Sequence, residues 1–353
     1  MTFEEFVLGA REKGASDIHL TVGAPTVIRV NGLLEPYGDL DDLTVNRAIL
    51  SLLTPEQQRV FSEGHDIDFS FELSNGARQR VNVFRQNGKL ACSIRLLNSY
   101  IPSFEELKLP PVIKKLAEKK RGLILVTGPT GSGKSTTLSA MLDHINHTKA
   151  VHIISIEDPI EYRYEPALAT IHQRELGRDT QDFVSALRSA LREDPDIILV
   201  GELRDFETIR LAILAAETGH LVLGTLHTSS AALTIDRIVD ACPESVQEQI
   251  RASFANQVAG IISQNLVPKA DGSGRLAALE IMIGTDAVRN LIKTGKLAQL
   301  ESTIQAGSRE GMCTMNDALA RYYRRDLITY ETAMDYCTDR EEMEKALNAA
   351  KGF

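Results

Sequence analysis

The sequence is poor in cysteine, and the positions of its four cysteines exclude two common kinds of site. They are far apart in the chain and form no C-x-x-C pair: Cys92, Cys242, Cys313 and Cys337. A structural zinc site takes its ligands from short paired motifs, and a disulfide framework needs closely spaced cysteines in a short chain. The spacing therefore fits neither kind of site.

Signals for export and for membrane insertion are also absent. The first residues, Met1–Glu5, are acidic, whereas a signal peptide begins with basic and then apolar residues. No apolar run approaches the roughly 20 residues that a transmembrane helix needs. We therefore expect a cytoplasmic protein that reaches a membrane only through its partners.

Positive charge is in deficit as well. The 39 lysine and arginine residues are outnumbered by 48 aspartate and glutamate residues, so the net charge is −9. An acidic chain is as a whole a poor ligand for phosphate backbones, whatever basic surface it carries locally. We therefore expect no nucleic-acid partner. The 353 residues exceed the length of one average domain, so we expect two domains.

The pattern of residues 1–98 is that of a mixed α/β domain. Five short runs are strand-like: Ile18–Leu20, Thr26–Val30, Ile67–Phe71, Arg80–Phe84 and Cys92–Leu96. Three Asn-Gly pairs are hairpin signals: Asn31–Gly32, Asn75–Gly76 and Asn87–Gly88. Residues 99–115 contain Pro102, Pro110 and Pro111 beside polar residues, and we interpret them as a linker.

From residue 116 the pattern changes to short apolar strands that alternate with helices. The strands are predicted at Gly122–Thr127, Val151–Ile156, Ile197–Val200 and Leu221–Thr225. Helical periodicity covers Asp182–Asp194 and Asp205–Thr218. Nearly all-apolar strands between helices predict a parallel sheet that is covered on both faces. Residues 285–353 are predicted to form a helical tail.

A phosphate-binding loop is the strongest local signal. The sequence G-P-T-G-S-G-K-S-T fits G-x-x-x-x-G-K-[ST] and lies between a predicted strand and a predicted helix. The residues that we expect to bind ATP are Gly128, Thr130, Gly131, Ser132, Gly133, Lys134, Ser135 and Thr136. Glycines let backbone N–H groups approach phosphate oxygens, Lys134 adds positive charge, and Ser135 offers a hydroxyl to Mg²⁺. The alternative is a Gly/Ser turn that merely starts a helix.

An acid at the end of a buried strand is the expected partner of this loop. The run Asp196–Glu202 has the Walker B pattern, with Gly201 where many relatives have aspartate. We assign Glu202 to orienting or activating the attacking water, since strand carboxyl ends are where such sheets place their chemistry. The alternative is that Glu202 only pairs with Arg204.

Two further segments leave structural and functional interpretations open. Asp158, Pro159 and Glu161 have the spacing of a helix capping box, or they contact a metal ion or water. His220 and His227 flank the predicted strand Leu221–Thr225. A histidine at the end of a central strand could sense the γ phosphate, or it could be a core histidine.

Together these segments resemble one family, the secretion ATPases of type II secretion and type IV pili. Leu191–Asp205 resembles the family signature, Ile156–Glu161 its Asp box, and Thr218–Thr228 its His box. Within the family the chain is most similar to the retraction ATPases, and the resemblance covers nearly the whole chain. Ser16–Leu20 resembles their amino-terminal domain, and Ala287–Lys293 resembles an element associated with retraction.

The resemblance implies a fold, an activity and partners. The fold is α/β, with a PAS-like domain at 1–98 and a RecA-like P-loop ATPase domain at 116–353. The activity is that of an ATP-hydrolysing hexameric motor for type IV pilus retraction and twitching motility. The partners are five further copies of the chain and an inner-membrane pilus platform protein, at the inner face of the cytoplasmic membrane.

The resemblance also implies roles for individual residues. Glu161 becomes a catalytic-site carboxylate and His227 a γ-phosphate contact, with Glu157 and His220 as weaker candidates. Arg80 and Arg275 match arginines that reach a neighbouring subunit's nucleotide, and Arg78 and Arg95 match less well. Each of these arginines would otherwise be a solvated charge at a strand edge.

Two alternative functions share these motifs. One is an accessory nucleotide-binding ring subunit with weak turnover, and the other is a related secretion-system ATPase. The complete loop and Glu202 favour an enzyme over the accessory subunit. The absence of a four-cysteine zinc module and the presence of Ala287–Lys293 favour retraction over assembly.

Overall fold

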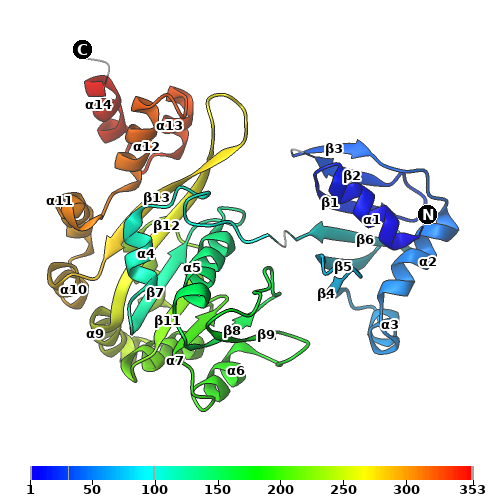
Figure 1. The fold of residues 1–353 in the computed structure, drawn as a ribbon, viewed down its shortest axis with the longest axis horizontal. Helices are drawn as coiled ribbons and strands as arrows, with labels where there is room; N and C mark the ends of the chain where they lie inside the picture. Colours follow the sequence, from blue (N-terminus) through cyan, green and yellow to red (C-terminus); the bar gives the residue numbers. More distant parts are fainter. Residues whose placement is uncertain (1, 31, 98–99, 351–353) are drawn as a thin grey trace. The chain divides into compact units, whose positions relative to one another are not determined.

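The computed structural model describes residues 2–30, 32–97 and 100–350, and the chain forms two compact units (Figure 1). The first unit comprises Met1–Tyr100 with Pro159–Arg163, and the second comprises Ile101–Asp158 and Tyr164–Phe353. Asn31 of one predicted turn, residues 98–99 at the predicted linker and the last three residues of the predicted tail lie outside the described residues.

The first unit is built on a six-stranded antiparallel sheet in the order β3-β2-β1-β6-β5-β4. Its strands are β1 (Ala15–Thr21), β2 (Val27–Val30), β3 (Leu33–Pro36), β4 (Ile67–Glu72), β5 (Arg78–Gln86) and β6 (Lys89–Leu96). The five predicted strands are confirmed, and β3 is an addition. Asn87 and Gly88 join β5 to β6 with φ of 49° and 74°, as a tight hairpin turn requires.

Three helices complete the first unit: α1 (Phe3–Glu12), α2 (Asp42–Leu52) and α3 (Pro55–Ser62). The residues before these helices are Thr2, Asp41 and Thr54 respectively, and the side chain of each accepts a backbone N–H from the first turn of its helix. Phe6 of α1 and Ile49 of α2 are fully buried with Val81 of the sheet in one apolar core. The helices therefore cover the apolar face of the sheet.

The second unit is built on a seven-stranded sheet in the order β13-β12-β7-β11-β10-β8-β9. Its strands are β7 (Gly122–Thr127), β8 (His152–Glu157), β9 (Thr170–Glu175), β10 (Ile197–Val200), β11 (Leu221–Leu226), β12 (Val258–Pro268) and β13 (Arg275–Ile283). The four predicted strands are confirmed. The sheet is parallel except for the edge strand β13, which runs antiparallel to β12. The prediction of a parallel sheet thus needs one correction, and β9, β12 and β13 were not predicted.

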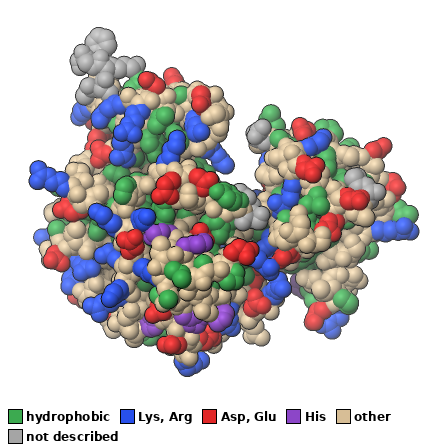
Figure 2. Space-filling view, viewed as in Figure 1, with side chains coloured by type: hydrophobic (Ala, Val, Ile, Leu, Met, Phe, Trp, Pro, Cys, Tyr) green, Lys and Arg blue, Asp and Glu red, His purple; other side chains and the backbone are tan. Residues whose placement is uncertain are grey.

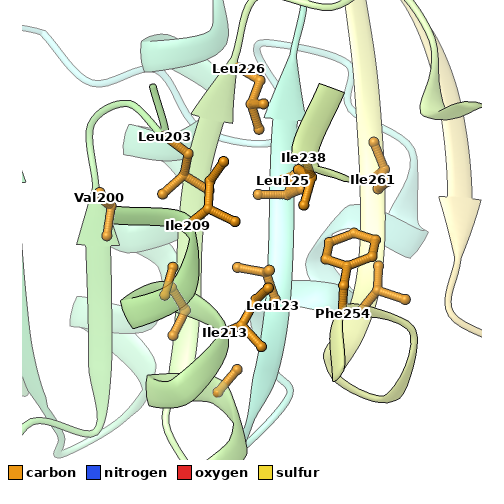
Figure 3. Close-up of a cluster of buried hydrophobic side chains, with 14 of the residues drawn as sticks. Leu123, Leu125, Val200, Leu203, Ile209, Ile213, Leu226, Ile238, Phe254 and Ile261 are labelled. Carbon is orange, nitrogen blue, oxygen red and sulfur yellow. The ribbon is translucent and has the colours of Figure 1, made fainter. Parts of the chain in front are cut away.

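Helices cover both faces of this sheet, as expected from its apolar strands. They are α4 (Pro111–Ala117), α5 (Lys134–Thr148), α6 (Phe183–Ala190), α7 (Phe206–Glu217), α8 (Ala231–Asp240) and α9 (Gln247–Gln257), with a 3₁₀ turn η1 at Glu244–Val246. Along β7, Leu123 and Leu125 face one core with α7, α8 and α9 (Figure 3), and Ile124 and Val126 face another with α4 and α5. This alternation has the two-residue period of a strand.

The described part of the carboxy-terminal tail is helical, which confirms the prediction as far as residue 350. It contains α10 (Asp286–Lys293), α11 (Leu300–Ala306), α12 (Met315–Arg324), α13 (Tyr330–Tyr336) and α14 (Arg340–Ala350), with 3₁₀ turns η2 (Leu297–Gln299) and η3 (Gly307–Glu310). Leu319 of α12 is buried with Val267 and Ala278 of the sheet. The hydroxyl of Tyr322 donates to the carbonyl of Ala277 at 2.7 Å. Helix α12 is therefore fixed to β13.

The surface of the described residues is mixed in charge. Acidic and basic side chains are interspersed over the face shown in Figure 2. Among the described residues, no helix combines the length and the apolar character that a membrane crossing requires.

Candidate active site

Three neighbouring parallel strands of the second unit bring the predicted site residues to one edge of the sheet. Strand β11 lies between β7 and β10. The phosphate-binding loop follows β7, His227 follows β11, and Glu202 follows β10. Because the carboxyl ends of parallel strands meet at the same edge, the loop, the histidine and the acid lie along that edge.

The loop needs its glycines for steric as well as conformational reasons. Gly128 has φ of 144°, and a Cβ there would lie 2.2 Å from the carbonyl oxygen of Gln264. Gly133 has φ of 88° and precedes α5, and a Cβ there would lie 2.8 Å from the Gln264 amide nitrogen. Only glycine fits both positions, so this loop is more than a polar turn that starts a helix.

Gln264 of β12 supports the loop from behind and was not found from the sequence. Its side chain is 3% exposed. Its amide nitrogen donates to the Ser132 carbonyl at 2.6 Å, and its amide oxygen accepts from the Thr137 hydroxyl at 2.7 Å. One buried amide thus joins the loop to the first turns of α5. No local motif marks a glutamine in this role, because its partners are more than 100 residues away in the chain.

The loop has the features of a phosphate cradle. Helix α5 begins at Lys134 and has no side-chain cap, so its first N–H groups face the loop. The Lys134 ammonium donates to the carbonyls of Gly128 at 2.8 Å and Pro129 at 3.0 Å. The Ser132 hydroxyl is buried and has no hydrogen-bond partner among the described residues. These donors fit an anion, which would satisfy the orphaned hydroxyl.

The backbone on either side of Glu202 is held by the two neighbouring strands. The Gly201 N–H donates to the Ile156 carbonyl at 2.8 Å, and the Leu203 N–H donates to the Thr225 carbonyl at 3.0 Å. A Cβ on residue 201 would lie 3.0 Å from the Ile156 carbonyl oxygen. This crowding favours glycine at position 201.

The Glu202 carboxylate lies between two basic side chains. One oxygen is 2.7 Å from an Arg204 guanidinium nitrogen, and the other is 3.4 Å from His227 Nε2. Burial alone would raise the pKa of Glu202, but the hydrogen bond and charge of Arg204, together with His227, outweigh it and lower this pKa. Glu202 therefore pairs with Arg204, as its alternative interpretation expects, and it also contacts the predicted site histidine.

The two candidate histidines lie at opposite ends of β11. The His227 side chain is 45% exposed and contacts Glu202, so the interpretation of His227 as a core histidine is wrong. His220 precedes the strand, and its Nδ1 lies 2.8 Å from the carbonyl of Ala215 near the end of α7. His220 therefore belongs to the opposite edge of the sheet and completes the end of a helix.

The candidate acids Glu157, Asp158 and Glu161, at and after the end of β8, differ from one another in what they contact. One Glu157 oxygen accepts from the Ser155 hydroxyl at 2.6 Å and from the Gln173 amide at 3.1 Å, which ties β8 to β9. Residues 160–166 form no helix, so the capping-box interpretation of Asp158 and Glu161 is wrong. Glu161 belongs to the segment Pro159–Arg163, which groups with the first unit, and its catalytic role stays a prediction.

The candidate arginines have different surroundings. Arg80 forms an ion pair with Asp68 at 2.6 Å, and Arg95 pairs with Asp17 at 3.1 Å. Arg78 is buried and donates to the Ser70 hydroxyl at 2.8 Å. Arg275 is exposed at the start of β13. Their predicted contacts with a neighbouring subunit stay predictions.

The chain is similar to known proteins over almost its whole length. The family model for type II/IV secretion system proteins matches residues 4–350. The type IV pilus retraction ATPase PilT of Pseudomonas aeruginosa is 49% identical over 337 residues, which cover 95% of this chain and 98% of that protein. A twitching motility protein of Neisseria gonorrhoeae is 45% identical over 336 residues, covering 93% of this chain and 90% of the relative. A crystal structure of the pilus retraction motor PilT with bound ADP matches with a TM-score of 0.90 and 46% identity, covering 98% of this chain and 99% of that one.

The glycine-rich loop lies at the carboxyl edge of a parallel sheet, and an acid lies at the same edge two strands away. This arrangement is that of the P-loop nucleotide-binding proteins. Within that class, the chain belongs to the type II/IV secretion system protein family. The resemblance to retraction ATPases and the α/β fold class expected from the motifs are confirmed.

The buried amide of Gln264 provides a test of the cradle. We predict that Gln264→Ala weakens Mg-ADP binding about tenfold, because the Ser132 carbonyl loses its buried donor and the loop loses its anchor. Titration calorimetry measures the affinity. Gln249→Ala, an exposed glutamine on α9, is the control and should bind as the unchanged protein does. Equal affinities for both variants would contradict the supporting role of Gln264.

Proposed function

We propose that the chain is an ATP-hydrolysing motor that powers type IV pilus retraction and twitching motility. The observation that carries this proposal is the contact of Glu202 with His227 at the sheet edge that bears the phosphate cradle. The 49% identity to a retraction ATPase over 95% of the chain supports the specific task. The bound ADP in the related crystal structure supports the choice of nucleotide.

The loop residues are assigned to binding the nucleotide. The backbone N–H groups of Gly131 and Gly133 and the hydroxyls of Ser132 and Thr136 face phosphate oxygens, together with Thr130. The Lys134 ammonium moves from the loop carbonyls to the β and γ phosphates. The Ser135 hydroxyl would help to hold Mg²⁺, which would supply positive charge to neutralise the charge that develops on the phosphates. The described residues contain no cluster of three or more His, Cys, Asp or Glu side chains that could hold a metal.

Glu202 is assigned to orienting the attacking water. Its carboxylate is ionised at neutral pH, since Arg204 and His227 hold its pKa low. An ionised acid next to the γ phosphate would repel it unless cations compensate, and Arg204 and His227 provide that compensation. With Arg204 paired to one carboxylate oxygen, the other oxygen would orient the water when His227 turns toward the γ phosphate.

The assembled motor is proposed to be a homohexamer. Arg80 and Arg275 are assigned to contacts with a neighbour's nucleotide, and Glu161 to the catalytic site. An arginine supplied across an interface couples hydrolysis to subunit motion. Residues 1–98 form the PAS-like domain, 99–115 the linker and 116–353 the RecA-like domain. The ring acts on a pilus platform protein at the cytoplasmic membrane, which it reaches through that partner.

Removal of the Glu202 charge tests the enzyme assignment. We predict that Glu202→Gln lowers kcat for ATP hydrolysis about 10²- to 10⁴-fold while the affinity for Mg-ATP is kept, because the attacking water loses its acceptor and the phosphate-binding loop is unchanged. Steady-state turnover and calorimetry measure the two quantities. Glu207→Gln, an acid on α7 paired with Arg188 and Arg210, is the matched control. Full turnover in Glu202→Gln would contradict the assignment, and negligible turnover in the unchanged protein would favour the accessory subunit.

The same variant tests the pilus assignment in cells. Deletion of the gene should leave pili assembled but unable to shorten, with twitching lost. Glu202→Gln should fail to restore twitching, whereas Glu207→Gln should restore it. Loss of assembled pili on deletion would instead point to an assembly or secretion ATPase.

The basic partner of Glu202 determines how activity depends on pH. Arg204→Ala removes the main influence that lowers the pKa of Glu202. The effect of burial, which raises this pKa, is then no longer opposed by Arg204. Because Glu202 acts as the ionised form, we predict that the acid limb of the kcat profile moves to higher pH. Because the limb of the unchanged protein lies on the acid side of the ordinary glutamate pKa, kcat is measured from about pH 3.5 to 8. The control, Arg188→Ala, should leave the limb unchanged, and an unmoved limb in Arg204→Ala would show that the pair does not set the profile.

A further inference from the structure

A buried carboxylate that the proposed mechanism does not use lies on β13 of the second unit. Glu280 is 6% exposed. One of its oxygens accepts the backbone N–H of Ala231 at 2.7 Å, and the backbone N–H of Met315 faces the same carboxylate and lowers its pKa. Ala231 is the first residue of α8, and Met315 is the first residue of α12. A single side chain therefore joins the starts of two helices that are distant in sequence.

The caps of both helices leave these two N–H groups for Glu280. The Ser230 hydroxyl caps α8 by accepting the N–H of Leu233 at 3.3 Å. The Thr314 hydroxyl caps α12 by accepting the N–H of Asp317 at 3.1 Å. Each cap satisfies one of the donors at a helix start, so the first N–H still needs an acceptor. The partial positive charge at both helix starts also favours a carboxylate there.

The surrounding backbone keeps this arrangement in register. Ile281, the neighbour of Glu280, exchanges two backbone hydrogen bonds with Cys313, of 2.8 and 3.1 Å. These bonds hold the chain just before α12 against β13. Burial raises the pKa of Glu280, the two backbone donors oppose this rise, and Glu301 adds to it. A buried carboxylate is costly, and the two helix starts offset part of this cost.

Glu280 is connected to the active-site edge through α8. The segment from His227 to Ser230 joins β11 to α8, so the helix start fixes the end of the segment that carries the histidine. The hydroxyl of Thr228 in this segment lies 2.7 Å from the hydroxyl of Thr234 on α8. In the other direction, Glu280 pairs in register with Ser263 of β12, whose hydroxyl accepts from Thr127, directly before the loop, at 3.0 Å.

We propose that Glu280 is a positioning residue that fixes the His227 segment and ties it to the carboxy-terminal helices through the shared start of α8 and α12. The inference rests on the proposed function, in which His227 contacts the γ phosphate. A displacement of α12 would move the Glu280 carboxylate, to which the start of α8 is also bound. The position of His227 would change with it. The helical tail would thereby influence turnover without touching the nucleotide.

The test uses Glu280→Gln in the full-length protein. Glutamine keeps the shape but replaces one acceptor oxygen by a donor, so one of the two N–H groups loses its partner. We expect kcat for ATP hydrolysis to fall about tenfold with an unchanged affinity for Mg-ADP. In a His227→Ala background, Glu280→Gln should cause no further loss, since the two residues act through one contact. Glu301→Gln, a nearby acid on α11, is the matched control and should keep full turnover.

A second variant removes the same hydrogen bond from the opposite side. Ala231→Pro deletes the donated N–H, and proline is accepted at the first position of a helix. It should reproduce the loss in kcat. Equal fold-losses of Glu280→Gln with and without His227 would overturn the proposal. So would a lower melting temperature with normal kcat, since this is the result expected of a purely structural residue.

Hydrogen exchange separates this proposal from the proposed function. In Glu280→Gln, peptides covering residues 227–235 and 314–320 should both exchange faster than in the unchanged protein. If the unchanged protein has no turnover, the proposed function fails, and the exchange result still decides whether Glu280 joins the two helix starts. Faster exchange in neither peptide, or in only one, would overturn the proposal.

Discussion

The site depends on one constraint, which is that β7, β11 and β10 are adjacent and run in the same direction. Parallel strands end at a common edge, so residues that are about 70 to 100 positions apart in the chain meet there. The loop after β7 supplies donors for an anion, while Glu202 supplies negative charge beside it. His227, on the strand between them, contacts Glu202 and shares its sheet edge with the loop. Chemistry at this edge therefore needs no residue from the opposite end of the sheet, where His220 lies.

A buried polar layer behind the edge gives the loop its shape. Gln264 satisfies the Ser132 carbonyl, and Ser263 accepts from Thr127 just before the loop. Both residues lie on β12, whose central position between β7 and β13 brings them under the loop. Buried polar groups that are fully paired specify one arrangement, because any alternative leaves a donor or acceptor without a partner. The geometry of the cradle is thus determined as much by β12 as by the glycines.

Whether a feature could be predicted from the sequence depended on whether its signal is local or comes from the tertiary fold. The strands β7 and β10 and the loop were predicted correctly because their signals are local: an apolar run bounded by turn residues, and glycines at fixed spacing. Strand β12 was missed because it continues directly from α9 without a turn signal. Strand β13 does follow a local signal, the turn residues Asp271–Gly274, which a strand on each side would have explained. Gln264 and Glu280 were missed for a different reason. Their partners are chosen by the tertiary fold, and a lone glutamine or glutamate in an apolar strand carries no local signal. The capping box at Asp158 was a local pattern that tertiary context overrode.

A carboxylate suits the junction at Glu280 better than a neutral side chain does. Two N–H groups approach it from different helices, and an ionised acid offers acceptor sites on both oxygens and no donor. An amide in its place would present its own N–H groups to one helix start, and a hydroxyl would be too short to reach both. The positive ends of two helix dipoles also compensate the charge that burial penalises. The buried carboxylate of Glu280 is therefore stabilised while both helices begin beside it. In the proposed coupling, this is what makes the position of α8 depend on α12.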